Sequence, residues 1–332
     1  MAIPTSNTTV AYYAQLLKGN YAKGVANLEF IMQSPATAQD LLNTPEVLPV
    51  IYGVNDRNSA ALIKVMQKYG HGDVTLLSFL NTLLGTDYET LSALASSPEG
   101  MSAVIASLPA TNAFASSAAA IQAVIDATTA TYIPLAYMFE SDLMFQAVAR
   151  WTESYEVLQS SPSDQQAGYA VSALIGVAPH QPMSVLVASA AHMSSITESA
   201  AARLAVSVMR QGMYQAVRNI TAVAAIDASA DWAATLATNP RIANVEYPIA
   251  TGRVVRLDTP VYIINQMPNN TAASSVNLNL YSRANGATAA LSQNVPGATV
   301  SPVGISFTRI ENQKSSVTTV ATVTYKCIPC EL

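Results

Sequence analysis

Residues 91–130 read LSALASSPEG (91–100), MSAVIASLPA (101–110), TNAFASSAAA (111–120) and IQAVIDATTA (121–130). The four segments align without a gap, with alanine at positions 93, 103, 113 and 123. The residue that follows each of these alanines is Leu94, Val104, Phe114 or Val124. Degenerate copies of the pattern lie around Met144, Met183 and Met213. The stretch therefore predicts an internal repeat of ten residues.

The ten-residue period does not suit one continuous amphipathic helix. Each helical residue turns by about 100°, so ten residues fall roughly 80° short of three turns and the apolar face would spiral away. Within a segment, however, Met101, Val104, Ile105 and Leu108 share one helical face. We therefore predict short helices, broken at Ser-Ser-Pro and Leu-Pro, that stack side by side as a solenoid-like layer.

Helix start signals recur over the first two thirds of the chain. A hydroxyl residue that can cap a helix precedes a proline suited to the first helical turn at Ser34-Pro35, Thr44-Pro45, Ser97-Pro98 and Ser161-Pro162. The spacing of apolar residues is helical up to about Asn239. We predict an N-terminal helical region (1–90) and an alanine-rich short-helix repeat region (91–240).

The pattern changes to β after Asn239-Pro240. Alternating or β-branched segments occupy 253–257, 261–264, 276–281, 304–310 and 317–325, with turn residues such as Asn285-Gly286 between them. These segments predict a small antiparallel β-sandwich over 245–332. The predicted fold class is α+β, an array of short alanine-rich helices followed by this sandwich.

Composition narrows the range of partners. Half of the 332 residues are hydrophobic, but only 11% are charged and 7% are aromatic. A surface with so little charge favours burial in a large assembly. The net charge of -5 and the scattered Lys and Arg residues indicate no nucleic-acid partner.

Two long stretches, 100–125 and 165–197, contain no Asp, Glu, Lys or Arg. Polar residues and prolines interrupt both, so we interpret them as buried helices of a protein that does not insert into a membrane. The polar start of the chain predicts no targeting segment.

Few residues in the sequence suggest catalysis. His71, His180 and His192 are isolated, and we expect each to be structural. The sequence contains no phosphate-binding glycine loop and no nucleophile motif. We predict a protein that is not an enzyme and that uses no cofactor and no metal.

Two pairs of carboxylates lie close in sequence, Glu140 with Asp142 and Glu153 with Glu156. Glu153 and Glu156 share a helix face, and an acid/base pair is one interpretation. With Trp151 and Tyr155 beside them, the solvated edge of a helix or an aromatic-lined contact is the interpretation that we favour.

Cys327-Ile-Pro-Cys330 follows a predicted strand close to the last residue. A redox pair normally opens a helix, where the thiol pKa is lowered, and a zinc site needs two further ligands. Four interpretations stay open: two unreacted thiols, a disulfide to a neighbouring subunit, an intramolecular disulfide, and a metal site.

The Ser-Ser-Pro-x-x-Met-x-Ala-Val-x-Ala-Ser unit at residues 96–107 resembles the Ala/Ser/Met-rich decapeptide repeats of tailed-bacteriophage tail-fibre and collar or neck appendage proteins. The threonine-rich strand that runs into Val323-Thr-Tyr-Lys-Cys-Ile-Pro-Cys resembles the terminal β domains of such virion proteins. The resemblance implies a structural protein of the virion tail, neck or fibre. Its partners would be further copies of itself, as in a trimer, and other virion proteins.

Two alternative functions remain. In a host-receptor module the β part would bind a surface glycan through residues such as Tyr247, Tyr262 and Tyr281. A glycan-degrading enzyme would need two carboxylates at catalytic separation. The β part offers for this only Glu246, Asp258, Glu311 and Glu331.

Overall fold

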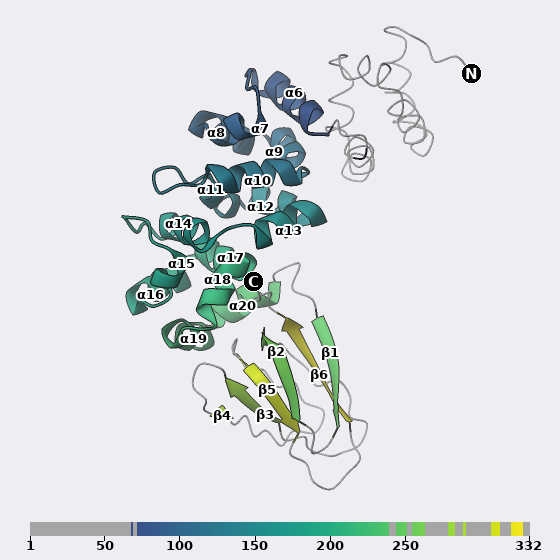
Figure 1. The fold of residues 1–332 in the computed structure, drawn as a ribbon, viewed down its shortest axis with the longest axis vertical. Coiled ribbons are helices and arrows are strands. Elements are labelled where there is room, and N and C mark those ends of the chain that lie inside the picture. The colour runs from purple at the N-terminus through teal and green to yellow at the C-terminus, as the bar shows by residue number, and fades with distance from the viewer. Residues whose placement is uncertain are drawn as a thin grey trace, which may run out of the picture. The chain divides into compact units, whose positions relative to one another are not determined.

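The structure is a computed structural model that describes Lys68, residues 72–238 and the backbone of six later strands (Figure 1). The chain divides into two compact units. Unit 1 comprises Met1–Ala127 and Ser141–Leu158, and unit 2 comprises Thr128–Glu140 and Gln159–Leu332. The predicted helices at Ser34-Pro35 and Thr44-Pro45 lie outside the described residues.

The described part of unit 1 is built from short helices. They are α6 (Gly72–Leu84), α7 (Leu91–Ala95), α8 (Pro98–Ala106), α9 (Leu108–Ala115), α10 (Ala118–Ala127), α12 (Asp142–Arg150) and α13 (Thr152–Ser160). The last of these ends two residues into unit 2.

The helical part of unit 2 follows the same plan. Its helices are α11 (Pro134–Glu140), α14 (Asp164–Leu174), α15 (Met183–Leu186), α16 (Ala190–Glu198), α17 (Ala200–Val208), α18 (Arg210–Ala216), α19 (Ile220–Asp227) and α20 (Ala230–Thr238). From α16 onward a new helix begins every ten residues.

A single residue links several consecutive helices. Ser107 is the C-cap of α8 and the N-cap of α9, and Ser199 plays both roles between α16 and α17. Their backbones are extended (φ -114°, ψ 110° and φ -91°, ψ 115°), which breaks one helix and starts the next. The Ser199 hydroxyl accepts a hydrogen bond from the Ala202 N–H at 3.2 Å. One cap residue and about nine helical residues therefore account for the ten-residue period.

The core is filled from fixed positions in each repeat. Counting the cap residue as position 0, the buried side chains recur at positions 3, 4 and 7, which share one helical face. Position 3 is often small, as at Gly100, Ala110, Ala202 and Gly212. Positions 4 and 7 are filled by Met101 and Val104 in α8, Thr111 and Phe114 in α9, Ile121 and Val124 in α10, Met193 and Ile196 in α16, and Val223 and Ile226 in α19.

Small residues at position 3 allow close approach between neighbouring helices. A Cβ added at Gly212 would lie 2.5 Å from the backbone oxygen of Val206 in the preceding helix α17. A Cβ at Gly100 would lie 2.8 Å from both Leu94 Cδ1 and the Tyr88 hydroxyl. The packing distance between helices therefore depends on the size of this residue.

Helices also pack on helices that come three places later in the chain. In unit 1, α6 packs on α9, α7 on α10, and α9 on α12. In unit 2, α11 packs on α14, α14 on α17, α15 on α18, α16 on α19, and α17 on α20. Each unit can be followed as a stack of short helices in Figure 1. Three decapeptides thus form one turn of a helical solenoid, and the prediction of a helical repeat is confirmed for the described helices.

The described strands after α20 form one antiparallel sheet. They are β1 (Asn244–Ala250), β2 (Val254–Tyr262), β3 (Leu278–Ser282), β4 (Thr288–Ala289), β5 (Phe307–Asn312) and β6 (Val320–Cys327). Their order in the sheet is β1-β6-β2-β5-β3-β4. Strand β2 shifts register between Arg256 and Val261, so that it pairs with β5 along its first half and reaches both β5 and β6 at Val261.

The predicted α+β fold class is wrong for residues 72–238, which are helical and contain no strand. The β-sandwich predicted over 245–332 lies mostly outside the described residues and stays a prediction. The six described strands are hydrogen-bonded in one sheet. Alternation of apolar and polar residues indicates strands, but pairing between distant segments, such as β1 with β6, decides their order in the sheet.

Two expected helix boundaries also change. Ser97-Pro98 begins α8 as expected, but α14 begins after the cap Ser163, two residues beyond Ser161. Leu108 does not continue the face of Met101 and Val104, because it is the first residue of α9 and is 52% exposed. The serine caps, more than the prolines, therefore mark the breaks.

Candidate functional site

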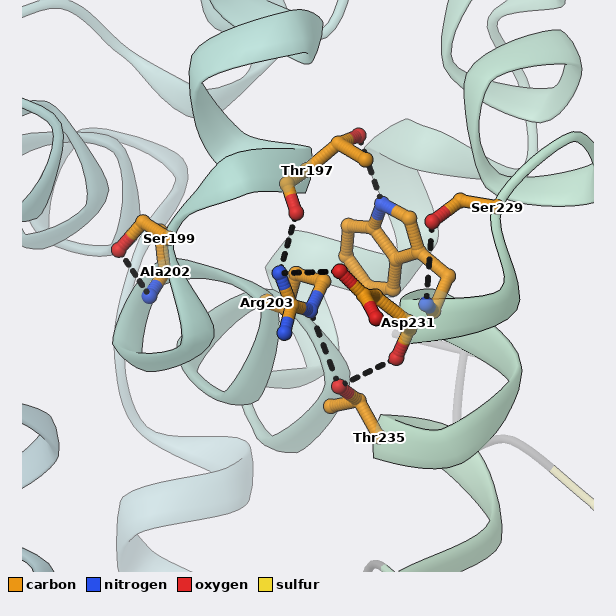
Figure 2. A network of polar contacts seen from close by, with 8 residues as sticks. Thr197, Ser199, Ala202, Arg203, Ser229, Asp231 and Thr235 are labelled. Atoms are coloured by element: carbon orange, nitrogen blue, oxygen red, sulfur yellow. Dashed lines mark hydrogen bonds and ion pairs between the residues drawn. The ribbon is translucent and has the colours of Figure 1, made fainter.

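A buried arginine occupies a core position of one repeat. Arg203 lies at position 4 of α17, where the other repeats mostly have an apolar side chain, and it is only 9% exposed. Figure 2 shows its guanidinium between α16 and α20. Its Nη1 donates to the backbone oxygen of Thr197, and its Nε donates to the Thr235 hydroxyl at 3.1 Å.

Trp232 completes this network from α20. Its indole N–H donates to the Thr197 hydroxyl at 3.0 Å, and its backbone N–H donates to the Ser229 hydroxyl at 3.3 Å. The Trp232 side chain is fully buried. Residues from α16, α17 and α20 therefore hold one another through Thr197.

Asp231 forms an ion pair with Arg203, in which the carboxylate lies 3.7 Å from Nη1 (Figure 2). The Asp231 side chain is 70% exposed, so solvent screens the ion pair. The guanidinium is held mainly by its hydrogen bonds to Thr197 and Thr235. This arrangement suits a structural role in joining helices.

The solvent-facing edges of the helices carry pairs of residues at positions 5 and 9. Gln122 donates to Asp126 at 2.8 Å on α10, and Ser194 donates to Glu198 at 3.3 Å on α16. After α18, the Arg218 guanidinium lies 3.4 Å from the centre of the Tyr214 ring. Each pair lies within one helix and its last turn. These pairs therefore do not join one helix to another.

The histidines make separate contacts. His180 Nδ1 lies 2.8 Å from the backbone oxygen of Ala130, and the ring is tilted at 6.5 Å from that of Tyr169. His192 lies in the first turn of α16, where its backbone N–H donates to the Ser189 hydroxyl at 3.3 Å. His71 lies outside the described residues. Among the described contacts, His180 and His192 have no partner in common.

The carboxylates considered as acid/base pairs lie on helix ends and edges. Glu140 ends α11 in unit 2 and Asp142 begins α12 in unit 1, and both are exposed. Glu153 and Glu156 are both exposed on α13. Tyr155 between them points into the core, 2% exposed, with its ring edge-on to Phe145 at 6.5 Å. The structure therefore places both glutamates on a solvated helix edge.

Of the two cysteines, Cys327 is the last residue of β6, where it is paired with Val261 of β2. Cys330 lies outside the described residues. The inter-subunit disulfide stays a prediction.

Sequence reasoning missed Arg203 and Arg218, because it treated Lys and Arg as scattered single charges. A signal was present for Arg203. Once the repeat is aligned on its serine caps, Arg203 falls at a position that is apolar in most other copies.

Among the described residues, no group of three or more His, Cys, Asp or Glu side chains is arranged to hold a metal ion. Within the same part of the chain, every helix is too short or too polar to cross a bilayer. No protein-family model matches the sequence, and a comparison with curated proteins finds no match.

Proposed function

We propose that this protein is a structural subunit that acts by self-assembly and by docking to other proteins. The observation that carries the proposal is the decapeptide solenoid, in which short helices joined by single cap residues stack on the third helix after them. Such an array stiffens a chain and presents a regular series of helix edges to partners.

The type of assembly is proposed from the sequence. The Ser-Ser-Pro-x-x-Met repeat of residues 96–107 resembles repeats of tailed-phage fibre and collar proteins. We therefore propose a component of a phage tail, neck or fibre, made of several copies of this chain. The polar network around Arg203 supports a structural role, because its donors are used to join helices.

The test is the mass of the purified protein in solution, measured by light scattering over a range of concentrations, with and without reductant. An oligomer under either condition supports the proposal, and a monomer under both contradicts it.

The same measurement tests the terminal cysteines. If the oligomer is covalent and dissociates with reductant, Cys330→Ser should abolish the cross-link. The control is Ser315→Ala, which removes a hydroxyl and no thiol and should leave the cross-link intact. Loss of the covalent oligomer in the control as well would contradict a disulfide through Cys330.

A further inference from the structure

The chain passes between the two units at three places, and only one of these passages contains a loop. The second passage runs from α11 to α12 through the single residue Ser141, and the third lies inside α13. The first runs from α10 in unit 1 to α11 in unit 2 through residues 128–133, which we call the connector. A free chain of six residues can span about 20 Å. The connector is therefore the passage with the length to act as a loose tether.

Hydrogen bonds fold the connector into a tight turn before α11. The Thr129 N–H donates to the Tyr132 backbone oxygen at 2.8 Å, and the Tyr132 N–H donates to the Thr129 hydroxyl at 3.2 Å. At the base of the turn, the Thr128 hydroxyl accepts the Leu135 N–H at 3.2 Å. Leu135 is fully buried in α11. The turn is therefore anchored to a helix of unit 2.

His180 holds the middle of this turn from a second loop of unit 2. Its Nδ1 lies 2.8 Å from the Ala130 backbone oxygen, 50 residues away in the chain. A carbonyl oxygen only accepts hydrogen bonds, so Nδ1 carries the hydrogen and donates it. The two loops can be followed in Figure 1, one between α10 and α11 and the other between α14 and α15.

The loop that carries His180 is itself fixed to α14. The Gln181 N–H donates to the buried Ser172 hydroxyl at 3.0 Å. Gly168 of α14 lies so close to this loop that an added Cβ would overlap the Gln181 backbone oxygen. The Tyr169 ring lies beside the imidazole, tilted and 6.5 Å away. The donor on His180 therefore has a firm support.

We propose that His180 is a clamp that holds the connector on unit 2 and prevents it from acting as a free tether between the units. With Ala130 held, only Thr128 and Thr129 lie between α10 and the clamped residue, and a free chain of that length spans only about 7 Å. The clamp therefore limits the freedom of the chain where it first leaves unit 1. This inference goes beyond the proposed self-assembly and does not depend on it.

The test measures amide hydrogen exchange in the intact protein, by mass spectrometry of peptides that cover residues 128–135. His180→Ala removes the donor to Ala130 and should speed exchange in these peptides by roughly fivefold, the factor that one net hydrogen bond supplies. His180→Asn retains a side-chain N–H near the position of Nδ1 and should stay close to the wild type.

The control is His192→Ala. It removes the ring of the other described histidine, whose Nδ1 has no hydrogen-bond partner among the described residues. Exchange in residues 128–135 should be unchanged in this variant. Cleavage by chymotrypsin after Tyr132 gives a second readout, because the protease needs the connector to open. Cleavage should be faster in His180→Ala than in His180→Asn or in the control.

Exchange in folded His180→Ala that equals exchange in the wild type overturns the clamp. An equal rise in His180→Asn or in His192→Ala also overturns it, because the donor on His180 would then not be what holds the connector. Where circular dichroism shows that His180→Ala does not fold, nitrogen NMR of the wild type decides. The chemical shifts of the neutral His180 ring should identify Nδ1 as the nitrogen that carries the hydrogen, and a bare Nδ1 overturns the clamp.

Discussion

Two buried serines have opposite environments. Ser154 is fully buried at position 3 of α13, and its hydroxyl has no hydrogen-bond partner among the described residues. Ser172 is also fully buried, but its hydroxyl accepts the Gln181 N–H at 3.0 Å. Ser154→Ala should raise the free energy of unfolding by about 1 kcal/mol, because an unsatisfied polar atom is removed. Ser172→Ala should lower it by a similar amount, and urea titration followed by circular dichroism measures both. Equal effects of the two substitutions would contradict this account.

Arg203 is expected to matter far more to stability than the acid beside it. Arg203→Met keeps an apolar stem at position 4 but removes the donors to Thr197 and Thr235. We expect the free energy of unfolding to fall by about 2 kcal/mol. Asp231→Asn should cost less than about 1 kcal/mol, because the carboxylate is 70% exposed. Unfolding in urea, followed by tryptophan fluorescence, compares the two. A larger loss for the aspartate variant would show that the ion pair dominates.

At the scale of the element, the one-residue link decides where one helix ends and the next begins. Ser199→Ala removes the hydroxyl that accepts the Ala202 N–H, and it should lower the free energy of unfolding by about 1 kcal/mol. Ser199→Asp keeps an acceptor at the cap and should retain most of the stability. Thermal unfolding of the two variants tests this. An aspartate variant as unstable as the alanine variant would mean that capping is not the role of Ser199.

Gly212 tests whether local helix preference or helix packing prevails. In an exposed helix, Gly→Ala stabilises by about 1 kcal/mol. At Gly212 the new Cβ would lie 2.5 Å from the Val206 backbone oxygen, so the helices must separate. Gly212→Ala should therefore lower the melting temperature. Gly176→Ala is the control in which only backbone strain acts, because Gly176 has a φ of 68° and no atom within 4 Å of an added Cβ. An increase in melting temperature for Gly212→Ala would contradict the close approach.

At the scale of the whole molecule, packing on the third helix along the chain gives some helices more neighbouring helices than others. In unit 2, α17 packs against α11, α14, α16, α18 and α20, whereas the four-residue α15 packs against α14 and α18. Amide hydrogen exchange should therefore be slowest in α17 and much faster in α15. Exchange followed by mass spectrometry of peptides covering each helix gives the comparison. Equal protection of the two helices would contradict a core centred on α17.

The sequence by itself determined the repeat and the type of its elements. The ten-residue period, the alanine register and the apolar residues Leu94, Val104, Phe114 and Val124 are all visible in the chain, and all four side chains are buried. These features are local, since a helix of nine residues and its cap depend on neighbours within one repeat. Some strands could be located in the sequence because their alternating pattern is also local. Their order in the sheet could not be predicted from the sequence.

Only the tertiary structure decided how the repeats are used. The packing of helices on the third helix after them, the single sheet order and the burial of Arg203 against Thr197 and Thr235 depend on contacts between segments far apart in the chain. A local pattern shows which face of a helix is apolar, but not which partner covers it. The partner is selected by the fit of side chains across the whole core, and this is why the ten-residue period was predictable while the three-helix turn was not.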